Sequence, residues 1–259
     1  MKTLLRLYRL IVPLQLRHRL YRTRTTVARN MAQSGTPIVE PIRNIPANVQ
    51  PILDALRPLP GQWHEAGTLS IKALEAIAHH LYAVEMPLLH TLETGCGKST
   101  VLLSNISAHH QVFALSNMDN SWDTVMTFPL TNKETVHLIN GPTQRTMLKH
   151  NFEHKIQFAL IDGPHGYPFP DIEYYFIYPH LEENALLVID DIHIPNIKNL
   201  FDFLCADEMF HLEEVISTTA IFRRTSAPTF DPTGDSWWKQ GYNHNVAAYY
   251  LKTYPSLLN

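Results

Sequence analysis

The chain has 259 residues, of which 45% are hydrophobic and 17% are charged, and its formal net charge is −3. This composition is too apolar for a disordered protein, and the length suits one sizeable core with appendages. Only two cysteines are present, Cys96 and Cys205, so a disulfide framework is excluded and a cytoplasmic location is expected.

The N-terminal arm, residues 1–39, is strongly basic because it contains eight Lys and Arg residues and no Asp or Glu. Its apolar residues begin at helical spacing, but Arg6 and Arg9 interrupt them and Pro13 breaks the helix, which excludes a transmembrane segment. The arm is typical of a segment on an anionic membrane surface or of an organelle transit peptide. Equally, it can cover the domain or a partner subunit in a homo-oligomer. The acidic remainder of the chain argues against nucleic-acid binding.

Six prolines lie between residues 37 and 60, and they predict an extended segment over residues 40–62. The folded domain is expected to span residues 63–225. Ser70 is the predicted N-cap of its first helix, whose apolar face repeats at helical spacing. The C-terminal extension, residues 226–259, contains Trp237 and Trp238, which would form either a substrate lid or an anchor for the tail.

From residue 88 onward, short apolar runs alternate with helix-length segments. Such runs are typical of parallel strands that are buried on both faces. Two extended segments with a very short connection predict an antiparallel hairpin near the end. The sequence therefore predicts a doubly wound α/β fold, a Rossmann-like seven-stranded sheet with a terminal hairpin. The expected strands are 88–93, 111–116, 135–140, 156–162, 185–190, 210–216 and 219–224, and two of the expected helices are 99–107 and 171–181.

Acidic residues follow two of these predicted strands. Asp162 ends the fourth strand, and Asp190 and Asp191 end the fifth. In an open α/β sheet the carboxyl ends of parallel strands border one crevice, so these side chains should converge there. Three carboxylates at one place predict a site for a hard divalent cation such as Mg²⁺. For Asp190 or Asp191 alone, the alternative is a helix N-cap before Pro195.

The turn after the first strand reads Glu-Thr-Gly-Cys-Gly-Lys-Ser-Thr over residues 93–100 and has two interpretations. Its second half matches a phosphate-binding P-loop, but Leu92 stands where that motif requires its first glycine. Alternatively it is a nucleoside site, in which Gly95 and Gly97 allow a close backbone approach and Glu93 supplies a carboxylate.

With this turn, residues 63–225 resemble the class I S-adenosylmethionine-dependent methyltransferases. The acidic residues after the fourth and fifth strands make the chain similar to the divalent-metal-dependent O-methyltransferases of the catechol type and their bacterial relatives. This resemblance implies metal ligands at Asp162, Asp190 and Asp191 and a catalytic base at His165. It also implies methylation of a small-molecule hydroxyl at this crevice, with S-adenosylmethionine as the cofactor and Mg²⁺ as the divalent metal. The implied cofactor-binding residues are Glu93, Gly95, Gly97, Ser99, Ser116, Asp119 and Asp162.

Two departures from that family stand out. The second strand ends at Ser116 rather than at the usual ribose-binding acid, and Asp119 is the nearest carboxylate. Asp191 occupies a position where the catechol enzymes have an amide, so the crevice is more anionic here. The segment 141–144 after the third strand is expected to border the adenine.

Three other functions are open on the same residues. A non-haem iron oxygenase would use His165, His193 and a carboxylate as its facial triad, although His193 also suits an ordinary loop position. A P-loop phosphotransferase would bind ATP with Mg²⁺ at the turn 93–100, and a non-catalytic binding protein would keep the fold without turnover. The acceptor is equally open among catechol, sugar, polyketide, peptide and lipid-linked hydroxyls.

Overall fold

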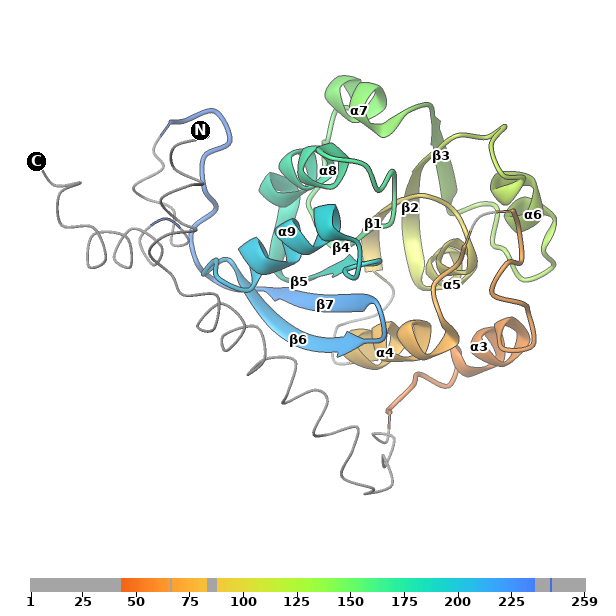
Figure 1. The fold of residues 1–259 in the computed structure, drawn as a ribbon. Helices are drawn as coiled ribbons and strands as arrows, with labels where there is room; N and C mark the ends of the chain where they lie inside the picture. Colours follow the sequence, from red (N-terminus) through yellow and green to blue (C-terminus); the bar gives the residue numbers. More distant parts are fainter. Residues whose placement is uncertain (1–42, 66, 83–87, 236–242, 244–259) are drawn as a thin grey trace, which may run out of the picture. The chain divides into compact units, whose positions relative to one another are not determined.

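The computed structural model describes residues 43–65, 67–82, 88–235 and 243 (Figure 1). The chain divides into two units, Met1–Ile42 and Arg43–Asn259, and all described residues belong to the second. The predictions for the basic arm, residues 1–39, and for Trp237 and Trp238 lie outside the described residues. In the described part, no helix combines the length and the apolar character needed to cross a bilayer.

A seven-stranded sheet forms the centre of the fold, in the order β3-β2-β1-β4-β5-β7-β6 (Figure 1). The first five strands of this order are parallel, and β7 runs antiparallel to both β5 and β6. The predicted doubly wound sheet with a terminal hairpin is thereby confirmed. The strands are β1 (Leu88–Thr94), β2 (Ser107–Ala114), β3 (Val136–Asn140), β4 (Ile156–Ile161), β5 (Leu181–Ile189), β6 (Phe210–Ile216) and β7 (Thr219–Arg224).

Helices cover both faces of this sheet because its central strands are apolar on both sides. In β4, Phe158 and Leu160 join the core cluster that includes α4 and α5, whereas Ala159 and Ile161 join the cluster that includes α8 and α9 (Figure 1). The helices are α3 (Gln50–Leu56), α4 (Ile71–Tyr82), α5 (Lys98–Ile106), α6 (Ser121–Thr127), α7 (Thr143–Thr146), α8 (Phe169–Ile177) and α9 (Pro195–Leu204), with 3₁₀ turns at Met147–Lys149 and Tyr178–His180.

The start of the folded region differs from the prediction. Residues 40–62 were expected to be extended throughout, which is wrong for α3, where Pro51 lies in the first turn. Proline is tolerated there because its missing N–H has no partner within the helix in any case. The α3 residues Leu53 and Leu56 are fully buried in the core shared with α4 and α5. By contrast, the cap of α4 is as predicted, since the Ala73 N–H donates to Ser70 Oγ at 3.1 Å.

Two strand boundaries also moved. β2 begins at Ser107 rather than at residue 111. Its first residues include polar side chains, so the apolar run that predicted the strand begins later than the strand itself. β5 begins at Leu181, before the apolar run that was recognised, and its pairing with β4 shifts register between Ile156 and Phe158.

Ion pairs join β6 to α4 and to the residue that opens the described region. Glu214 of β6 contacts Arg43 at 2.6 Å and His80 of α4 at 3.1 Å. These ion pairs link the last strand pair to the helical layer in addition to the core packing.

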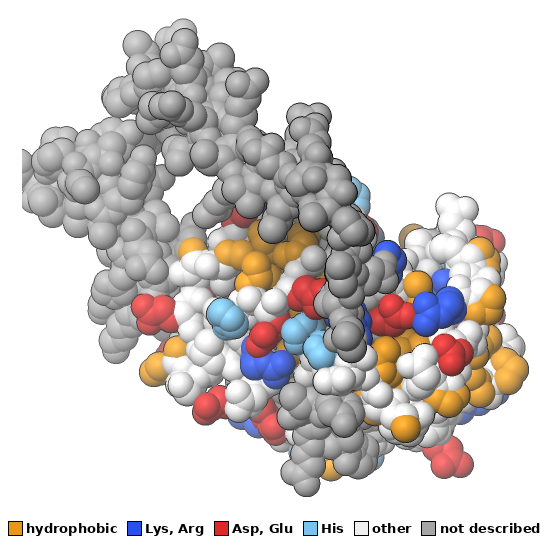
Figure 2. All heavy atoms as spheres, turned by 90° about the horizontal axis from the view of Figure 1, so that it is seen from below, with side chains coloured by type: hydrophobic (Ala, Val, Ile, Leu, Met, Phe, Trp, Pro, Cys, Tyr) orange, Lys and Arg blue, Asp and Glu red, His pale blue; other side chains and the backbone are white. Residues whose placement is uncertain are grey.

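On the face shown in Figure 2, acidic, basic and histidine side chains are intermixed rather than segregated by charge.

Candidate active site

A cavity of about 440 Å³ lies at the carboxyl ends of the central strands. The strand order reverses between β1 and β4, which is where doubly wound folds bind their ligands. The turn after β1, the end of β2 and the segments after β4 and β5 all contribute to its lining. Its size is in the usual range for small-molecule sites.

Gly95 is the residue in the turn after β1 that only glycine suits. Its φ is +85°, and a Cβ built there would lie 2.5 Å from the backbone oxygen of Asp162. The close contact between the ends of β1 and β4 therefore depends on the absence of a side chain. Gly97 differs, because its φ of −173° is ordinary extended backbone.

The structure brings six predicted site residues to the cavity lining and leaves four away from it. On the lining are Gly95, Asp119, Asp162, His165, Asp190 and Asp191, together with Gly141, Pro142 and Thr143 from the segment expected to border the adenine. Away from it are Glu93, Gly97, Ser99 and Ser116.

Each of these four residues has a structural reason for its place. Glu93 is fully buried, and its Oε1 accepts hydrogen bonds from the Thr100 hydroxyl and from His110 Nε2. Gly97 is the N-cap of α5, and Ser99 is buried within that helix. The Ser116 N–H donates to Asn140 Oδ1 at 3.0 Å, which joins the ends of β2 and β3. Glu93 therefore supports the turn from beneath and does not reach into the cavity.

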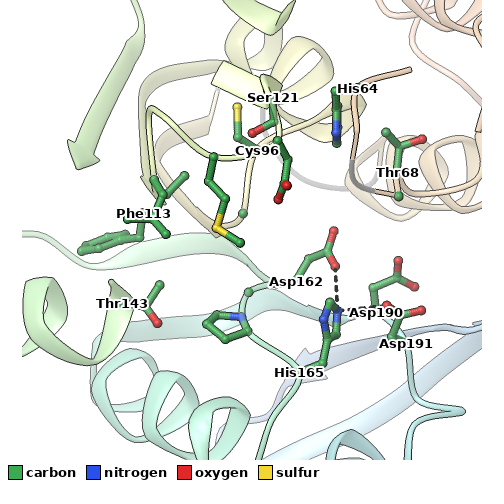
Figure 3. Close-up of a pocket in the computed structure, with 18 of the residues that line it drawn as sticks. His64, Thr68, Cys96, Phe113, Ser121, Thr143, Asp162, His165, Asp190 and Asp191 are labelled. Carbon is green, nitrogen blue, oxygen red and sulfur yellow. Dashed lines mark ion pairs between the residues drawn. The ribbon is translucent and has the colours of Figure 1, made fainter. Parts of the chain in front are cut away.

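Three groups converge on one side of the cavity: Asp162, His165 and Asp191. His165 Nε2 lies 3.0 Å from Asp191 Oδ2 and 3.8 Å from Asp162 Oδ1 (Figure 3). One ligand atom from each residue lies within 4.8 Å of the others, a spacing that suits a metal ion. Two carboxylates and an imidazole are a donor set for a divalent cation.

Asp190, the third predicted metal ligand, is next to this group but does not belong to it. Its Oδ1 accepts hydrogen bonds from the hydroxyls of Thr218 at 3.2 Å and Thr219 at 2.7 Å, at the start of β7. The β6–β7 hairpin thus orients the Asp190 carboxylate. The N-cap alternative does not describe it or Asp191, because α9 is preceded by Ile194 and has no side-chain cap.

The charges in this group strongly influence one another. The pKa of Asp162 is raised to about 7, mainly by burial, with His165 opposing the rise and the Asp190 and Asp191 charges contributing to it. In turn, the interaction with the Asp162 carboxylate raises the pKa of His165, against the effect of burial. A cation at this place would remove the repulsion between the carboxylates.

Asp162 is positioned by a buried network that extends to α8. Its backbone N–H donates to Thr94 Oγ1 at 3.0 Å, and the Thr94 hydroxyl donates to Glu173 Oε2 at 2.9 Å. Glu173 is fully buried, and burial raises the pKa of its carboxyl group to about 7. The end of β4 is therefore fixed through Thr94 and Glu173.

The opposite wall contains residues that belong to no recognised sequence motif. His64, Thr68, Met118 and Ser121 line the cavity there. Figure 3 shows His64 and Thr68 across the cavity from His165 and Asp191. These residues come from the irregular segment before α4, from the loop after β2 and from the first residue of α6, where neither periodicity nor spacing distinguishes a lining residue.

Two of the alternative functions lose their structural basis. A P-loop lysine must reach a bound phosphate, but Lys98 Nζ donates to the Leu59 carbonyl at 2.9 Å and does not line the cavity. Within the described residues the metal-type group contains one histidine and two carboxylates, and His193 contacts only its edge, 3.5 Å from Asp191 Oδ1. This is the reverse of the two-histidine, one-carboxylate facial triad.

The sequence and the fold agree on the class of protein. A family model described as a methyltransferase domain matches residues 92–192, the part of the chain that carries the Gly95 turn and all the clustered acidic residues. The resemblance to class I methyltransferases is thus confirmed over residues 92–192, which match this family model. A comparison with curated proteins found no match.

Solved structures with the same fold include O-methyltransferases. A provisionally assigned caffeoyl-CoA O-methyltransferase from Staphylococcus aureus is 12% identical with a TM-score of 0.55, covering 79% of this chain and 99% of that one. A provisionally assigned O-methyltransferase from Klebsiella pneumoniae is 11% identical with a TM-score of 0.52, covering 78% and 97%. A cofactor-bound protein from MTB is 13% identical with a TM-score of 0.50, covering 68% and 87%. At these identities the likeness concerns the fold.

Proposed function

We propose that the protein transfers the methyl group of S-adenosylmethionine to a hydroxyl group of a small molecule, assisted by a divalent cation. The observation that carries this proposal is the joint placement of the Gly95 turn and the group of Asp162, His165 and Asp191 on one cavity. Most of the cavity lining belongs to residues 92–192, which match a methyltransferase-domain model, and the cavity lies at the reversal point of the sheet.

The residues fit the cofactor at the turn after β1. Gly95 exposes its backbone to the cavity without a side chain, as a bound nucleoside or amino-acid group requires. Asp119 is the only carboxylate among the lining residues of the loop after β2. It would therefore hold the ribose, because the family's usual acidic residue is replaced by Ser116 in this chain. Gly141, Pro142 and Thr143 would border the base.

The residues also fit a hard divalent cation. Asp162 and Asp191 each offer a carboxylate oxygen, and these two oxygens lie within 4.8 Å of each other, close enough to bind one ion. We assign the cation to these two carboxylates, with Asp190 beside them. A bound cation would orient the acceptor hydroxyl and lower its pKa.

His165 would take the proton of the acceptor hydroxyl at Nε2, the atom that contacts Asp191 and Asp162. The two carboxylates stabilise the imidazolium that results. Because methyl transfer is an in-line displacement, the cavity must hold the acceptor oxygen opposite the sulfonium carbon. The wall of Asp162 and His165 faces that of His64 and Thr68, which leaves room for donor and acceptor between them (Figure 3).

Calorimetry with S-adenosylhomocysteine, with and without Mg²⁺, tests the proposal. The wild type should bind this product analogue, and a methylation assay over a panel of hydroxyl acceptors should lose activity on chelation. Asp162→Asn and Asp191→Asn should lower activity in a way that high Mg²⁺ restores only in part. Asp202→Asn is the matched control, because this aspartate is exposed on α9 and pairs with Lys198.

The results separate the parts of the proposal. If the folded wild type does not bind S-adenosylhomocysteine, the methyltransferase function is refuted. If cofactor binding and methylation are intact but insensitive to chelation, the proposed role of the cation is refuted. The carboxylates would then act only by influencing the protonation of His165. Oxygen consumption that depends on added iron would instead support the oxygenase alternative.

A further inference from the structure

Four histidine rings form a row across the amino-terminal ends of the parallel strands. His90 of β1 and His109 of β2 are register partners, and their rings stack with centroids 5.1 Å apart. On one side of this pair, the His154 ring from the segment before β4 stacks on His90 at 4.2 Å. On the other side, His137 of β3 stacks on His109 at 5.9 Å. The fold thus gathers imidazoles from four separate segments at one place.

This histidine row lies at the opposite ends of the strands from the candidate active site. His90 precedes Gly95 by five residues, a separation of about 16 Å at the usual strand rise of about 3.3 Å per residue. None of the four histidines lines the active-site cavity. His90 and His154 instead line a separate hollow of about 330 Å³. The row is therefore independent of the residues assigned to the cofactor and to the first cation.

The ring nitrogens of the row are available to a ligand from solution. No hydrogen bond or ion pair joins any of the four rings to another described residue, and their contacts in this part of the chain are with one another. His90 is half-buried, whereas His109, His137 and His154 are exposed. Imidazole nitrogens are the commonest protein ligands of transition metals.

The protonation and the surroundings of the row favour a metal ion that prefers nitrogen. Burial lowers the pKa of His90, and the charges of His154 and His109 lower it further, so this ring is neutral at neutral pH. The neutral ring is the form that binds a metal. Among the residues that line the hollow, Glu153 is the only carboxylate, and it accepts a hydrogen bond from Asn151 at 3.0 Å. Such a donor set suits Zn²⁺, Ni²⁺ or Cu²⁺ better than Mg²⁺.

The stacked rings must turn before they can share one ion. Among the described residues, the group that already places three ligand atoms within 4.8 Å is that of Asp162, His165 and Asp191. In the row, His90 and His109 are fixed on neighbouring strands, whereas His154 is exposed in the irregular segment before β4. Rotation about side-chain bonds, chiefly in His154, would direct the nitrogens at a common centre.

We propose that His90, His109 and His154 bind a transition-metal ion of the Zn²⁺, Ni²⁺ and Cu²⁺ class, at a second site separate from the active-site cavity. His90 is the central ligand because its ring contacts both of the others. His137 is not assigned as a ligand, since it contacts only the far side of His109. The bound ion would link β1, β2 and the segment before β4. This site goes beyond the proposed methyl transfer and does not depend on it.

The test first removes the other cation site. The untagged full chain carries Asp162→Asn and Asp191→Asn, which eliminates both carboxylates of the active-site group. Calorimetry on this background protein measures the binding of Cu²⁺, Ni²⁺, Zn²⁺ and Mg²⁺. The background should bind Cu²⁺ more tightly than Ni²⁺ or Zn²⁺, in the usual order for nitrogen ligands, and should show no heat from Mg²⁺ at the same concentrations.

Three further substitutions identify the ligands. His90→Phe, His109→Phe and His154→Phe each keep a flat ring for stacking but remove the ligand nitrogens. Each should weaken Ni²⁺ binding about 10- to 100-fold, which is the usual cost even for the loss of an outer-shell partner. His211→Phe on β6 is the matched control, because this histidine is exposed and outside the row, and its affinity should equal that of the background.

Electron paramagnetic resonance of bound Cu²⁺ gives a second, direct measurement. The background should show coupling to three imidazole nitrogens, and each Phe variant should show coupling to two. Circular dichroism and Tm in metal-free buffer check that the variants are folded.

The proposal is overturned if the folded background binds none of the three transition metals or prefers Mg²⁺. It is equally overturned if any one of His90→Phe, His109→Phe and His154→Phe, as a folded protein, keeps the Ni²⁺ affinity of the background.

Discussion

Glu173 allows a prediction whose sign and size follow from the structure. The residue is fully buried on α8, where burial raises the pKa of its carboxyl group from 4.5 to about 7. The folded protein therefore binds more protons than the unfolded chain between these two pH values. Stability must fall as pH rises through this window and then level off, because the charged form is disfavoured only in the folded state.

The shift from 4.5 to about 7 corresponds to roughly 3 kcal/mol as an upper value, at about 1.4 kcal/mol per pKa unit. Glu173→Gln removes the ionisation but keeps an oxygen that can accept from the Thr94 hydroxyl. We expect the variant to match the wild type near pH 4.5 and to be about 1 to 3 kcal/mol more stable above pH 7. For a domain of this size that difference raises Tm by about 2 to 10 °C.

Urea unfolding of both proteins at a series of pH values from 4.5 to 8.5, in the presence of a chelator, measures the difference directly. Glu134→Gln is the matched control, because this glutamate is exposed and should give a curve parallel to the wild type. If Glu173→Gln also runs parallel to the wild type over the whole range, the buried carboxyl group ionises normally and the reasoning fails.

Three further outcomes are expected. Gly95→Ala should weaken S-adenosylhomocysteine binding at least about tenfold and lower Tm by several degrees, since φ and the Asp162 backbone both exclude a Cβ; Gly61→Ala, with nothing within 4 Å and no place on the cavity lining, should change neither. His165→Ala should keep cofactor affinity, checked by calorimetry, while turnover falls about 10²- to 10⁴-fold. A chain that begins at Glu40 should bind the cofactor as the full chain does, measured in the same way, because residues 1–39 precede the unit that contains the site.

The sequence predicted the architecture well because the central strands are apolar on both faces. Runs such as Phe158–Ile161 carry side chains for two cores at once, and few other structures require that pattern. The helix α3 was missed for the opposite reason. Its prolines were counted as helix breakers, although Pro51 stands in the first turn, where it is compatible with a helix.

The site was predicted in part, and the division has a physical cause. Residues that follow the strands directly, such as Gly95, Asp162 and Asp191, are placed by the sheet and could be located from strand ends alone. Glu93 precedes the strand end, so its side chain turns into the layer beneath α5 and reaches His110 instead of the cavity. His64 comes from an irregular segment, whose path depends on contacts distant in the sequence, such as Lys98 with Leu59.

Asp162 is the residue through which the cofactor and cation parts of the site depend on each other. Its backbone oxygen is what a side chain at Gly95 would strike, its N–H is held by Thr94, and its carboxylate lies 3.8 Å from His165 Nε2. A displacement at the turn after β1 must therefore move a proposed metal ligand as well. A substitution at Gly95 should thus impair cofactor binding and the response to Mg²⁺ together, whereas a change that removes only the Asp191 carboxylate should impair the response to Mg²⁺ and leave cofactor binding intact.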